Sequence, residues 1–468
     1  MRKILLGAAT AALLGASVIA APPAFAAPPA DPAPSGVVPT DSLPNPLDDK
    51  RSALRESAIT GVLNGELQPE QRGDSTVVKL GPEDGAGADQ HAKRGKPGSG
   101  KDQYVELSRE TTDRIFVILA EFGDTASPYP PDPNAQRTEG PLHNQIPAPD
   151  RKVDNSTVWQ ADYSQQYFQE LYFGGAESLR DYYETQSSGR YSVGGEVTDW
   201  VKVDYTQGRY GTDVCGSNVC SSVWALVRDA ANVWYEDQLA KGRSVDEVNA
   251  DLASFDVWDR YDFDGDGDFN EPDGYIDHFQ IVHSGGDQAD GDPIYAGDAI
   301  WSHRWYAYVN QAGQTGPDAN KLGGTQIGSS GVWIGDYTIQ PENGGRSVFY
   351  HEYGHDLGLP DDYNILSGGD NNNEYWTLMA QSRLGAKKDQ GIGERGGDLG
   401  AWNKLQLGWL DYKLVQAGQR KVVDLGPAEY NTKKPQAVVV ALPKKTVTNE
   451  LGHRPAAHRS GTAGRATT

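Results

Sequence analysis

The sequence predicts a mixed α/β fold. It contains 55 glycines and 28 prolines among 468 residues, which implies many turns and loops and disfavours a helical bundle. Segments with strand-like and helix-like apolar spacing alternate irregularly, so one mixed α/β domain is expected rather than a repeat array. A chain of this length can also hold more than one domain and a substantial core.

The first expected element is a short helix between residues 46 and 71, where apolar side chains recur at helical spacing. The main ordered domain is expected to begin near Thr112. Residues 114–122 form an apolar run that predicts a buried strand, ended by Gly123 and Asp124. Residues 164–185 and 221–240 carry aromatic and aliphatic side chains at helical spacing and predict helices.

Two further strands are expected at residues 275–282 and 332–339. Residues 347–357 predict a helix with Ser347 as its N-cap. Residues 413–443 predict short strands and turns, including the apolar run 437–442, and are interpreted as the start of a β-rich module.

The composition is strongly acidic. The net charge is −23 and the pI is about 4.7, with a mean hydropathy of −0.61. Such a surface disfavours nucleic acid and anionic membranes as partners and favours divalent cations. Beyond the N-terminus no segment is apolar for long enough to span a bilayer, so no membrane association of the mature form is expected.

Residues 1–26 are predicted to be a signal peptide. Arg2 and Lys3 precede the apolar residues 4–21, and Ala24-Phe25-Ala26 supplies small residues at a cleavage site after Ala26. An uncleaved membrane anchor is the alternative. Cleavage would make the mature protein secreted and extracellular.

Residues 27–110 are interpreted as a propeptide and linker. The segment begins with residues rich in Ala, Pro, Asp and Ser, and residues 81–103 are again polar, with the basic run 93–96. A merely disordered extension is the alternative. The segment contains no cysteine, so any latency must use a carboxylate, another ligand or steric cover. At the other end, residues 444–468 predict a basic disordered or aberrant tail.

The two cysteines, Cys215 and Cys220, predict a small disulfide that closes a loop in an exported chain. A metal-binding pair is less favoured because no further histidine or cysteine lies nearby in the sequence.

Residues 262–273 resemble a calcium-binding loop. The expected oxygen ligands are Asp262, Asp264, Asp266, Asp268 and Asp273, around a tight turn at Gly267. Position 12 of the loop is Asp273 rather than the usual glutamate, and Pro272 disfavours a regular helix after the loop. A structural Ca²⁺ site is therefore expected, and a solvated acidic turn is the alternative.

The stretch from His351 to Asp361 predicts a zinc centre. Histidines at i and i+4 share one helix face, which suits two ligands of a tetrahedral zinc ion. Glu352 can take a proton from a metal-bound water. Gly358 permits the left-handed backbone that ends a helix, and Asp361 can then return as the third ligand. Asp362 is adjacent and could compete for the metal. A zinc peptidase is the first hypothesis.

A methionine turn follows. Met379 is the one methionine left after removal of the signal peptide, and it lies in residues 375–380. The pattern H-E-x-x-H-x-x-G-x-x-D with a following methionine turn resembles the metzincin clan, and in detail the M6 family of immune inhibitor A peptidases. The resemblance covers roughly residues 105–425, with a peptidase domain expected at 111–412. Supporting segments are 112–124, 277–279, 300–305 and 400–409.

The resemblance implies roles for individual residues. His351, His355 and Asp361 correspond to the zinc ligands, and Glu352 corresponds to the general base. Met379 corresponds to the methionine that forms the floor of the metal site, and this role is compatible with ordinary packing in the core. Metzincins usually have histidine as third ligand, whereas Asp361 agrees with M6. No tyrosine lies two residues after Met379, so a tyrosine ligand is not expected.

The resemblance also implies a metalloendopeptidase with protein or peptide substrates, and with its own propeptide as inhibitor. His283 and His303 are weaker candidates for stabilising an oxyanion, since lone histidines are more often structural. Two other hypotheses remain: a calcium- and zinc-stabilised surface-binding protein without turnover, and an inactive truncated peptidase. The family usually continues into further β-rich modules. Cleavage specificity, the activating protease and the oligomeric state are left open.

Overall fold

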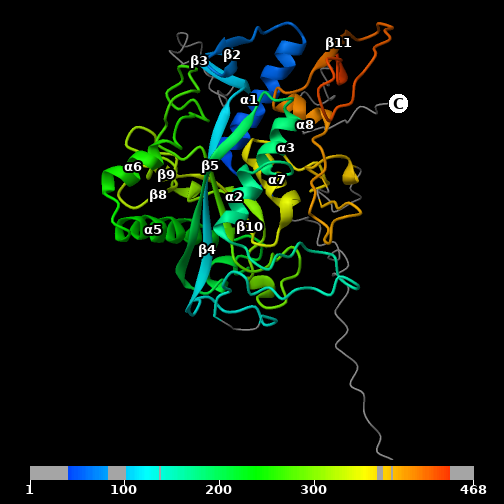
Figure 1. Ribbon diagram of the computed structural model, residues 1–468. Coiled ribbons are helices and arrows are strands. Elements are labelled where there is room, and N and C mark those ends of the chain that lie inside the picture. The colour runs from blue at the N-terminus through cyan, green and yellow to red at the C-terminus, as the bar shows by residue number, and fades with distance from the viewer. Residues whose placement is uncertain (1–40, 83–101, 136–138, 366–372, 381–382, 443–468) are drawn as a thin grey trace, which may run out of the picture.

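The computed structural model describes residues 41–82, 102–135, 139–365, 373–380 and 383–442 (Figure 1). Within these ranges the fold is mixed α/β, as predicted. None of the helices in the described ranges is both long and apolar enough to cross a bilayer. The expected signal peptide at 1–26 and the basic tail at 444–468 lie outside the described residues.

A five-stranded sheet forms the centre of the fold. The strand order is β5-β4-β6-β10-β7. β4 pairs in parallel with β5 and β6, β6 pairs in parallel with β10, and β7 is an antiparallel edge strand beside β10. The strands are β4 (Thr112–Thr125), β5 (Ser192–Tyr205), β6 (His278–His283), β7 (His303–Tyr306) and β10 (Asp336–Pro341).

Both faces of this sheet are covered. Along β4, Phe116, Ile118 and Ala120 enter one apolar cluster, whereas Ile115 and Val117 enter a second cluster on the opposite face. These residues are nearly inaccessible to solvent, which is typical of a parallel strand packed on both faces. The apolar run at 114–122 therefore predicted a buried strand correctly.

The end predicted for β4 was wrong, because the strand continues through Gly123 and Asp124 to Thr125. A Cβ atom on Gly123 would clash with the backbone oxygen of Asp204 in β5. The glycine thus permits close approach of two backbones beside an irregularity in the ladder, and does not terminate the strand.

Helices lie on the two faces of the sheet (Figure 1). On one face are α5 (Trp224–Ala240) and α6 (Val245–Ala253), with a 3₁₀ turn at Ser221–Val223 before α5. On the other are α2 (Gln165–Phe173), α3 (Leu179–Gln186) and α7 (Gly345–Asp356). The helix expected at 221–240 is confirmed. The helix expected at 164–185 is two helices, because α2 ends at Gly174 and Ser178 caps α3 by accepting a hydrogen bond from Asp181 N.

The later strand predictions need adjustment. β6 begins at His278, three residues after the predicted start, because Ile276 N and Asp277 N donate to Trp333 O and Phe255 O. The strand expected at 332–339 is divided into β9 (Trp333–Ile334) and β10, and β9 pairs with β8 (Thr325–Gln326). The division falls at Gly335, whose Cβ position lies against the ring of Tyr306.

Ordered structure before Thr112 is more extensive than the one short helix that was predicted there. Helix α1 (Pro46–Leu63) packs on a three-stranded sheet of β1 (Glu70–Arg72), β2 (Ser75–Pro82) and β3 (Asp102–Arg109). α1 is shorter than the expected 46–71 pattern, since the chain turns at Asn64 and Gly65. β3 was not predicted because polar and apolar residues do not alternate with burial along it: Glu106 and Ser108 are buried, whereas Leu107 is half-buried.

The remaining elements are short. They are α4 (Gly208–Gly211), α8 (Ala401–Gln406), and 3₁₀ turns at Ala296–Asp298, Val309–Gln311 and Glu374–Trp376. In the segment expected to be β-rich, β11 (Tyr412–Gln416) and β12 (Ala437–Ala441) form a parallel pair.

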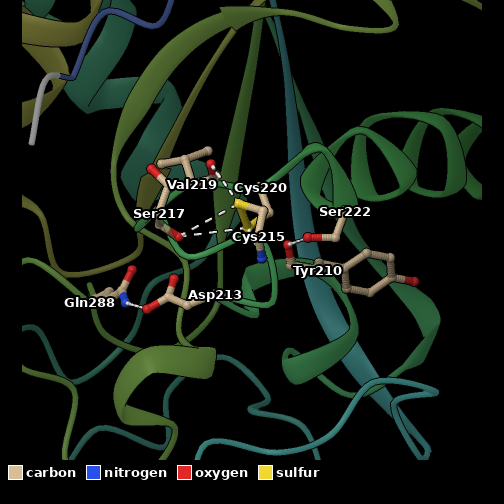
Figure 2. Close-up of a disulfide and its surroundings, with 8 residues drawn as sticks. All are labelled: Tyr210, Asp213, Cys215, Ser217, Val219, Cys220, Ser222 and Gln288. Atoms are coloured by element: carbon tan, nitrogen blue, oxygen red, sulfur yellow. Dashed lines mark hydrogen bonds between the residues drawn. A yellow bond between two sulfur atoms is a disulfide. The ribbon is translucent and has the colours of Figure 1, made fainter.

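Cys215 and Cys220 are joined by a disulfide that closes a surface loop between α4 and α5 (Figure 2). Hydrogen bonds fix the segments on both sides of the loop. Ser222 Oγ donates to Tyr210 O over 3.0 Å, and Gln288 Nε2 donates to Asp213 Oδ2 over 2.8 Å. The bridge closes the loop on itself, and no metal group in the described residues includes either cysteine.

Candidate active site

Helix α7 carries the two histidines of the motif. It begins at Gly345, which has a φ of +72°. Ser347 is not the N-cap, contrary to prediction, because the turn into the helix lies two residues earlier and Ser347 is buried within the first turn. At the other end Gly358 has a φ of +97°, as expected for the residue that turns the chain back. This return brings Asp361 to the histidines.

Three ligand atoms converge in the structure. The Nε2 atoms of His351 and His355 are 3.0 Å apart, and Asp361 Oδ1 lies 3.5 Å and 3.2 Å from them. Tetrahedral ligands about 2.0–2.1 Å from a zinc ion are separated by about 3.3 Å. The observed separations therefore match the edges of a zinc coordination tetrahedron.

Hydrogen bonds fix the histidine tautomers. His351 Nδ1 lies 2.9 Å from Leu378 O, and His355 Nδ1 lies 2.8 Å from Leu359 O. Carbonyl oxygens only accept, so each Nδ1 carries a proton and each Nε2 faces the other imidazole. In the neutral form that a metal requires, both Nε2 lone pairs would point to one shared ion. The residues present fit a bound Zn²⁺.

Asp361 and Asp362 point in different directions. Asp362 Oδ2 accepts a hydrogen bond from Asn403 Nδ2 over 2.9 Å and lies near Thr377. The carboxylate of Asp361 is 1% exposed and faces the imidazoles. Although burial opposes ionisation, His355 and His351 lower the pKa of Asp361. This geometry favours Asp361 as the third ligand.

Glu352 projects from α7 beside the same group. Its side chain is buried, and Oε2 has no hydrogen-bond partner among the described residues. Burial, followed by the carboxylates of Asp41, Asp361 and Asp287, raises the pKa of Glu352 well above its ordinary value. A buried carboxylate with an unpaired oxygen next to a metal-binding group is suited to accept a proton.

Met379 lies against α7. It is fully buried, and its Sδ lies 2.7 Å from the position that a Cβ on Gly354 would take. The same segment supplies Leu378 O to His351, and Met379 O accepts from Asp362 N over 2.7 Å. The turn around Met379 thus supports a histidine and orients the segment that carries Asp361.

The contact between Gly354 and Met379 gives a testable prediction. Gly354→Ala is expected to destabilise the fold by about 1–3 kcal/mol, because the added methyl group overpacks the core under the metal-binding group. Zinc affinity should fall with it. Gly175→Ala is the matched control, since a Cβ there meets open space. Chemical denaturation and zinc titration would check both variants, and equal stability of the two would contradict the expected overpacking.

Asp41 is a further residue at this centre, and the motif gave no indication of it. Asp41 Oδ2 lies 3.6 Å from His351 Nε2, and Asp41, His351 and Glu352 form a second group whose ligand atoms lie within 4.8 Å of one another. Trp301 Nε1 donates to Asp41 Oδ1 over 2.7 Å. Asp41 and Glu352 therefore lie beside the group formed by His351, His355 and Asp361, and His351 belongs to both groups.

A family model for the catalytic domain of immune inhibitor A peptidase M6 matches residues 101–410. The chain belongs to the M6 peptidase family. The resemblance stated from the motifs is thereby confirmed. The M6 match begins at the start of β3, so it includes residues that the sequence interpretation had assigned to the linker.

Two curated relatives agree with the M6 assignment. The chain is 30% identical over 369 residues to the pre-pro-metalloprotease PrtV of Vibrio cholerae serotype O1, in two strains, over 73% of this chain and 36% of the relative. It is 32% identical over 287 residues to immune inhibitor A of Bacillus thuringiensis subsp. alesti, over 57% of this chain and 36% of the relative. The aligned part of the chain spans about a third of the length of these relatives.

Behind the M6 motif a buried ionic network anchors α7. Asp356, which follows His355, pairs with Arg260 over 3.1 Å and with His278 Nδ1 in β6. His278 Nε2 lies 3.3 Å from Asp113 Oδ2 in β4. All four side chains are at most 4% exposed. The network therefore ties the metal-binding helix to two central strands.

The network predicts a loss of stability at alkaline pH. Burial disfavours the charged imidazole, but Asp356 and Asp113 outweigh it and raise the pKa of His278 to about 9 from 6.5. Because the pKa is higher in the folded state, the stabilisation is complete below pH 6.5 and is lost as the pH rises through about 9. The free energy of unfolding should therefore fall more steeply between pH 7 and 10 in the wild type than in His278→Gln. Equal slopes of the free energy of unfolding against pH in the two proteins would contradict the assignment of this loss to His278.

His283 and His303 lie outside the converging group. His283 Nδ1 contacts Ser284 O over 3.0 Å, and His303 contacts Trp301 O and Tyr337 OH. Both are fully buried, and burial lowers the pKa of each to about 4. Neither belongs to a metal-binding group in the described part of the chain. A structural role fits these contacts.

The acidic loop partly matches its prediction. Asp262, Asp264 and Asp266 converge, and Asp264 also joins a second group with Asp259 and Glu271. Asp268 and Asp273 belong to neither group among the described residues.

The two outlying aspartates have local partners of their own. Asp268 is exposed and accepts a hydrogen bond from Asn270 N. Asp273 is buried and accepts from Tyr275 N over 2.9 Å. The backbone N–H of Asp273 donates to the buried Asp256, which turns this position inward.

Proposed function

We propose that the chain is a secreted zinc endopeptidase that hydrolyses peptide bonds of extracellular proteins. The observation that carries the proposal is the convergence of His351, His355 and Asp361, with Glu352 beside them. Membership of the M6 peptidases and similarity to a relative named a metalloprotease add support. Secretion rests on the signal-peptide pattern of residues 1–26.

The reaction follows from the placement of these side chains. Zn²⁺ bound here would polarise the scissile carbonyl group and lower the pKa of a coordinated water. Leu378 O and Leu359 O hold both imidazoles with Nε2 toward the shared point. With its unpaired Oε2, Glu352 would accept a proton from the attacking water and would pass it to the leaving amine. Met379 keeps the floor of the site apolar.

The test of this function combines metal removal with substitution of a ligand. Cleavage of casein by the processed chain is expected to stop on treatment with a zinc chelator and to return when zinc is added. His355→Ala should lose both bound zinc and activity. His143→Ala is the control, because His143 is partly exposed and pairs with Glu121 away from the metal group. Chelator-resistant cleavage would overturn the proposal, and zinc binding without any cleavage would favour a binding protein without turnover.

We also propose the division of the chain expected from the sequence. Residues 27–110 would act as an inhibitory propeptide and linker, 111–412 as the peptidase domain and 413–443 as the start of a β-rich module. One contact of α1 with the proposed peptidase domain supports a covering role, since Arg55 donates to Gln406 O in α8. A cut in the segment 83–101 would separate α1, β1 and β2 from the rest of the chain, and β3, at the end of the proposed linker, would stay attached to the peptidase domain. N-terminal sequencing of secreted active material would locate the cut.

The acidic loop is proposed to bind structural Ca²⁺ through Asp262, Asp264 and Asp266, with Asp259 and Glu271. Calcium at a concentration 100-fold above its Kd should stabilise the wild type by about 3 kcal/mol. Asp264→Asn is expected to remove most of this effect because Asp264 belongs to both groups. Asp268→Asn should retain it. Thermal unfolding with and without calcium measures the difference, and an identical response of the two variants would contradict the assignment.

A further inference from the structure

We propose that Asp41 is the fourth metal ligand of a latent form, and that the segment preceding α1 holds the enzyme inactive through this carboxylate. The inference rests on the proposed zinc peptidase function. Asp41 Oδ2 lies 3.6 Å from His351 Nε2, and the carboxylate is within 4.8 Å of the relevant atoms of His351 and Glu352. No other carboxylate from the residues before β4 joins a metal-binding group in the described chain.

The coordination chemistry explains how this contact would block catalysis. Three protein ligands leave one position of a tetrahedral zinc ion for water, whereas four protein ligands close the site. His351, His355 and Asp361 provide three, and Asp41 would provide the fourth in place of water.

The carboxylate of Asp41 is held by side chains of the peptidase domain. Trp301 Nε1 donates to Oδ1 over 2.7 Å, and Tyr363 OH donates to Oδ2 over 3.3 Å. Tyr363 follows Asp361 by two residues and Trp301 lies just before β7. Both oxygens are therefore fixed by groups that flank the metal-binding residues, which leaves the side chain little freedom to turn away.

The backbone of the segment is anchored on the edge strand β7. Arg304 N donates to Asp41 O over 2.7 Å, and Leu43 N donates to Arg304 O over 3.0 Å. Ser42 pairs with Arg304 as a parallel β-bridge. The segment thus adds to the free edge of the sheet by main-chain hydrogen bonds, a mode that places an extended peptide with defined register.

Helix α1 fixes the other end of the segment. Asn45 caps α1 by accepting a hydrogen bond from Leu47 N over 3.1 Å. Asp48 in the first turn pairs over 3.2 Å with Arg304, which is 1% exposed. Pro44 O accepts from Trp305 Nε1 over 3.1 Å. Asp41 is therefore presented from a rigid element, and while α1 remains covalently linked to the domain its effective concentration at the metal is high.

The test uses the intact full-length chain with Co²⁺ in place of zinc, and acetohydroxamic acid as a probe of the open coordination position. Visible absorption of Co²⁺ reports the ligand set directly. Asp41→Asn and Asp41→Ala are expected to bind the probe at least about tenfold more tightly than the wild type. In the wild type Asp41 itself would occupy the coordination position, which lowers the apparent affinity of the metal for the probe. Glu56→Ala is the matched control, since Glu56 is an exposed carboxylate on α1, and it should behave as the wild type.

The outcomes separate the inference from the function on which it rests. Equal probe affinity and an unchanged Co²⁺ spectrum in both Asp41 variants would overturn the latency role while leaving the zinc centre intact. The wild type is expected to bind one Co²⁺ ion, and His355→Ala is expected to lose it. If no form binds such an ion, the wild type included, the proposed function itself is overturned. Asp41→Asn preserves the size of the side chain, so a folding defect in Asp41→Ala alone would not obscure the result.

Discussion

Glu352→Gln is expected to lower the rate of peptide hydrolysis by roughly 10²–10⁴-fold, the range of general acid–base catalysis. Glutamine keeps the size of the side chain but cannot accept the proton of the attacking water. Zinc content should be unchanged, because His351, His355 and Asp361 remain in place. The measurement is kcat/KM for a quenched peptide, together with zinc content.

Glu236→Gln is the matched control for this substitution. Glu236 is exposed on α5, which packs on the opposite face of the central sheet from α7. Its replacement should leave both kcat/KM and zinc content unchanged. Full activity of Glu352→Gln would show that another group accepts the proton, and a parallel loss of zinc would assign Glu352 to the metal rather than to proton transfer.

Asp356→Ala is expected to cost about 3–5 kcal/mol of stability, the penalty for breaking a buried ionic pair on one side. Without Asp356, the charges of Arg260 and His278 would remain buried without their main partner. The comparison is Asp251→Ala, which breaks the exposed pair of Asp251 with Arg243 and should cost less than about 1 kcal/mol.

Chemical denaturation of the two variants decides this prediction. A loss for Asp356→Ala no larger than that for Asp251→Ala would mean that the network does not anchor α7. Asp356 follows the ligand His355 directly. Loss of the ion pairs of Asp356 should therefore also weaken the hydrogen bond between His355 Nδ1 and Leu359 O. Zinc affinity is therefore expected to fall in Asp356→Ala and to be retained in Asp251→Ala.

Features that depend on neighbouring residues were predictable from the sequence. The apolar run of β4 indicated a strand packed on both faces, and α5 followed from apolar spacing over many turns. His351 and His355 share a helix face by their spacing alone. The turn at Gly358 required only that glycine adopts positive φ readily. Local geometry thus accounts for most of the candidate zinc centre.

Features that depend on tertiary packing were missed. Asp41 is far from His351 in the sequence, and nothing near it indicates a ligand, because its position is set by β-pairing with β7. In the acidic loop the spacing rule also did not indicate that Asp259 and Glu271 converge with Asp264, while Asp273 stays a predicted ligand whose backbone N–H donates to the buried Asp256. The contacts of Asp41 join segments that are distant in the sequence, so no local pattern indicates them.

The burial of polar side chains also exceeded what the sequence indicated. His278 and Asp113 occur within strand segments whose apolar neighbours dominate the pattern, yet they form the ionic network behind α7. The strand β3, whose buried positions include Glu106 and Ser108, was likewise assigned to a linker. In both cases the partner that makes burial favourable lies in another element, so no local pattern identifies it.

Anomalous X-ray diffraction at the zinc absorption edge tests the central claim most directly. Crystals of the zinc-loaded chain should show one strong anomalous peak within about 2.0–2.1 Å of His351 Nε2 and His355 Nε2, and close to Asp361 Oδ1. The peak should be absent in His355→Ala. A zinc peak elsewhere in the chain, or an unchanged peak in His355→Ala, would contradict the assignment of these residues as the metal centre.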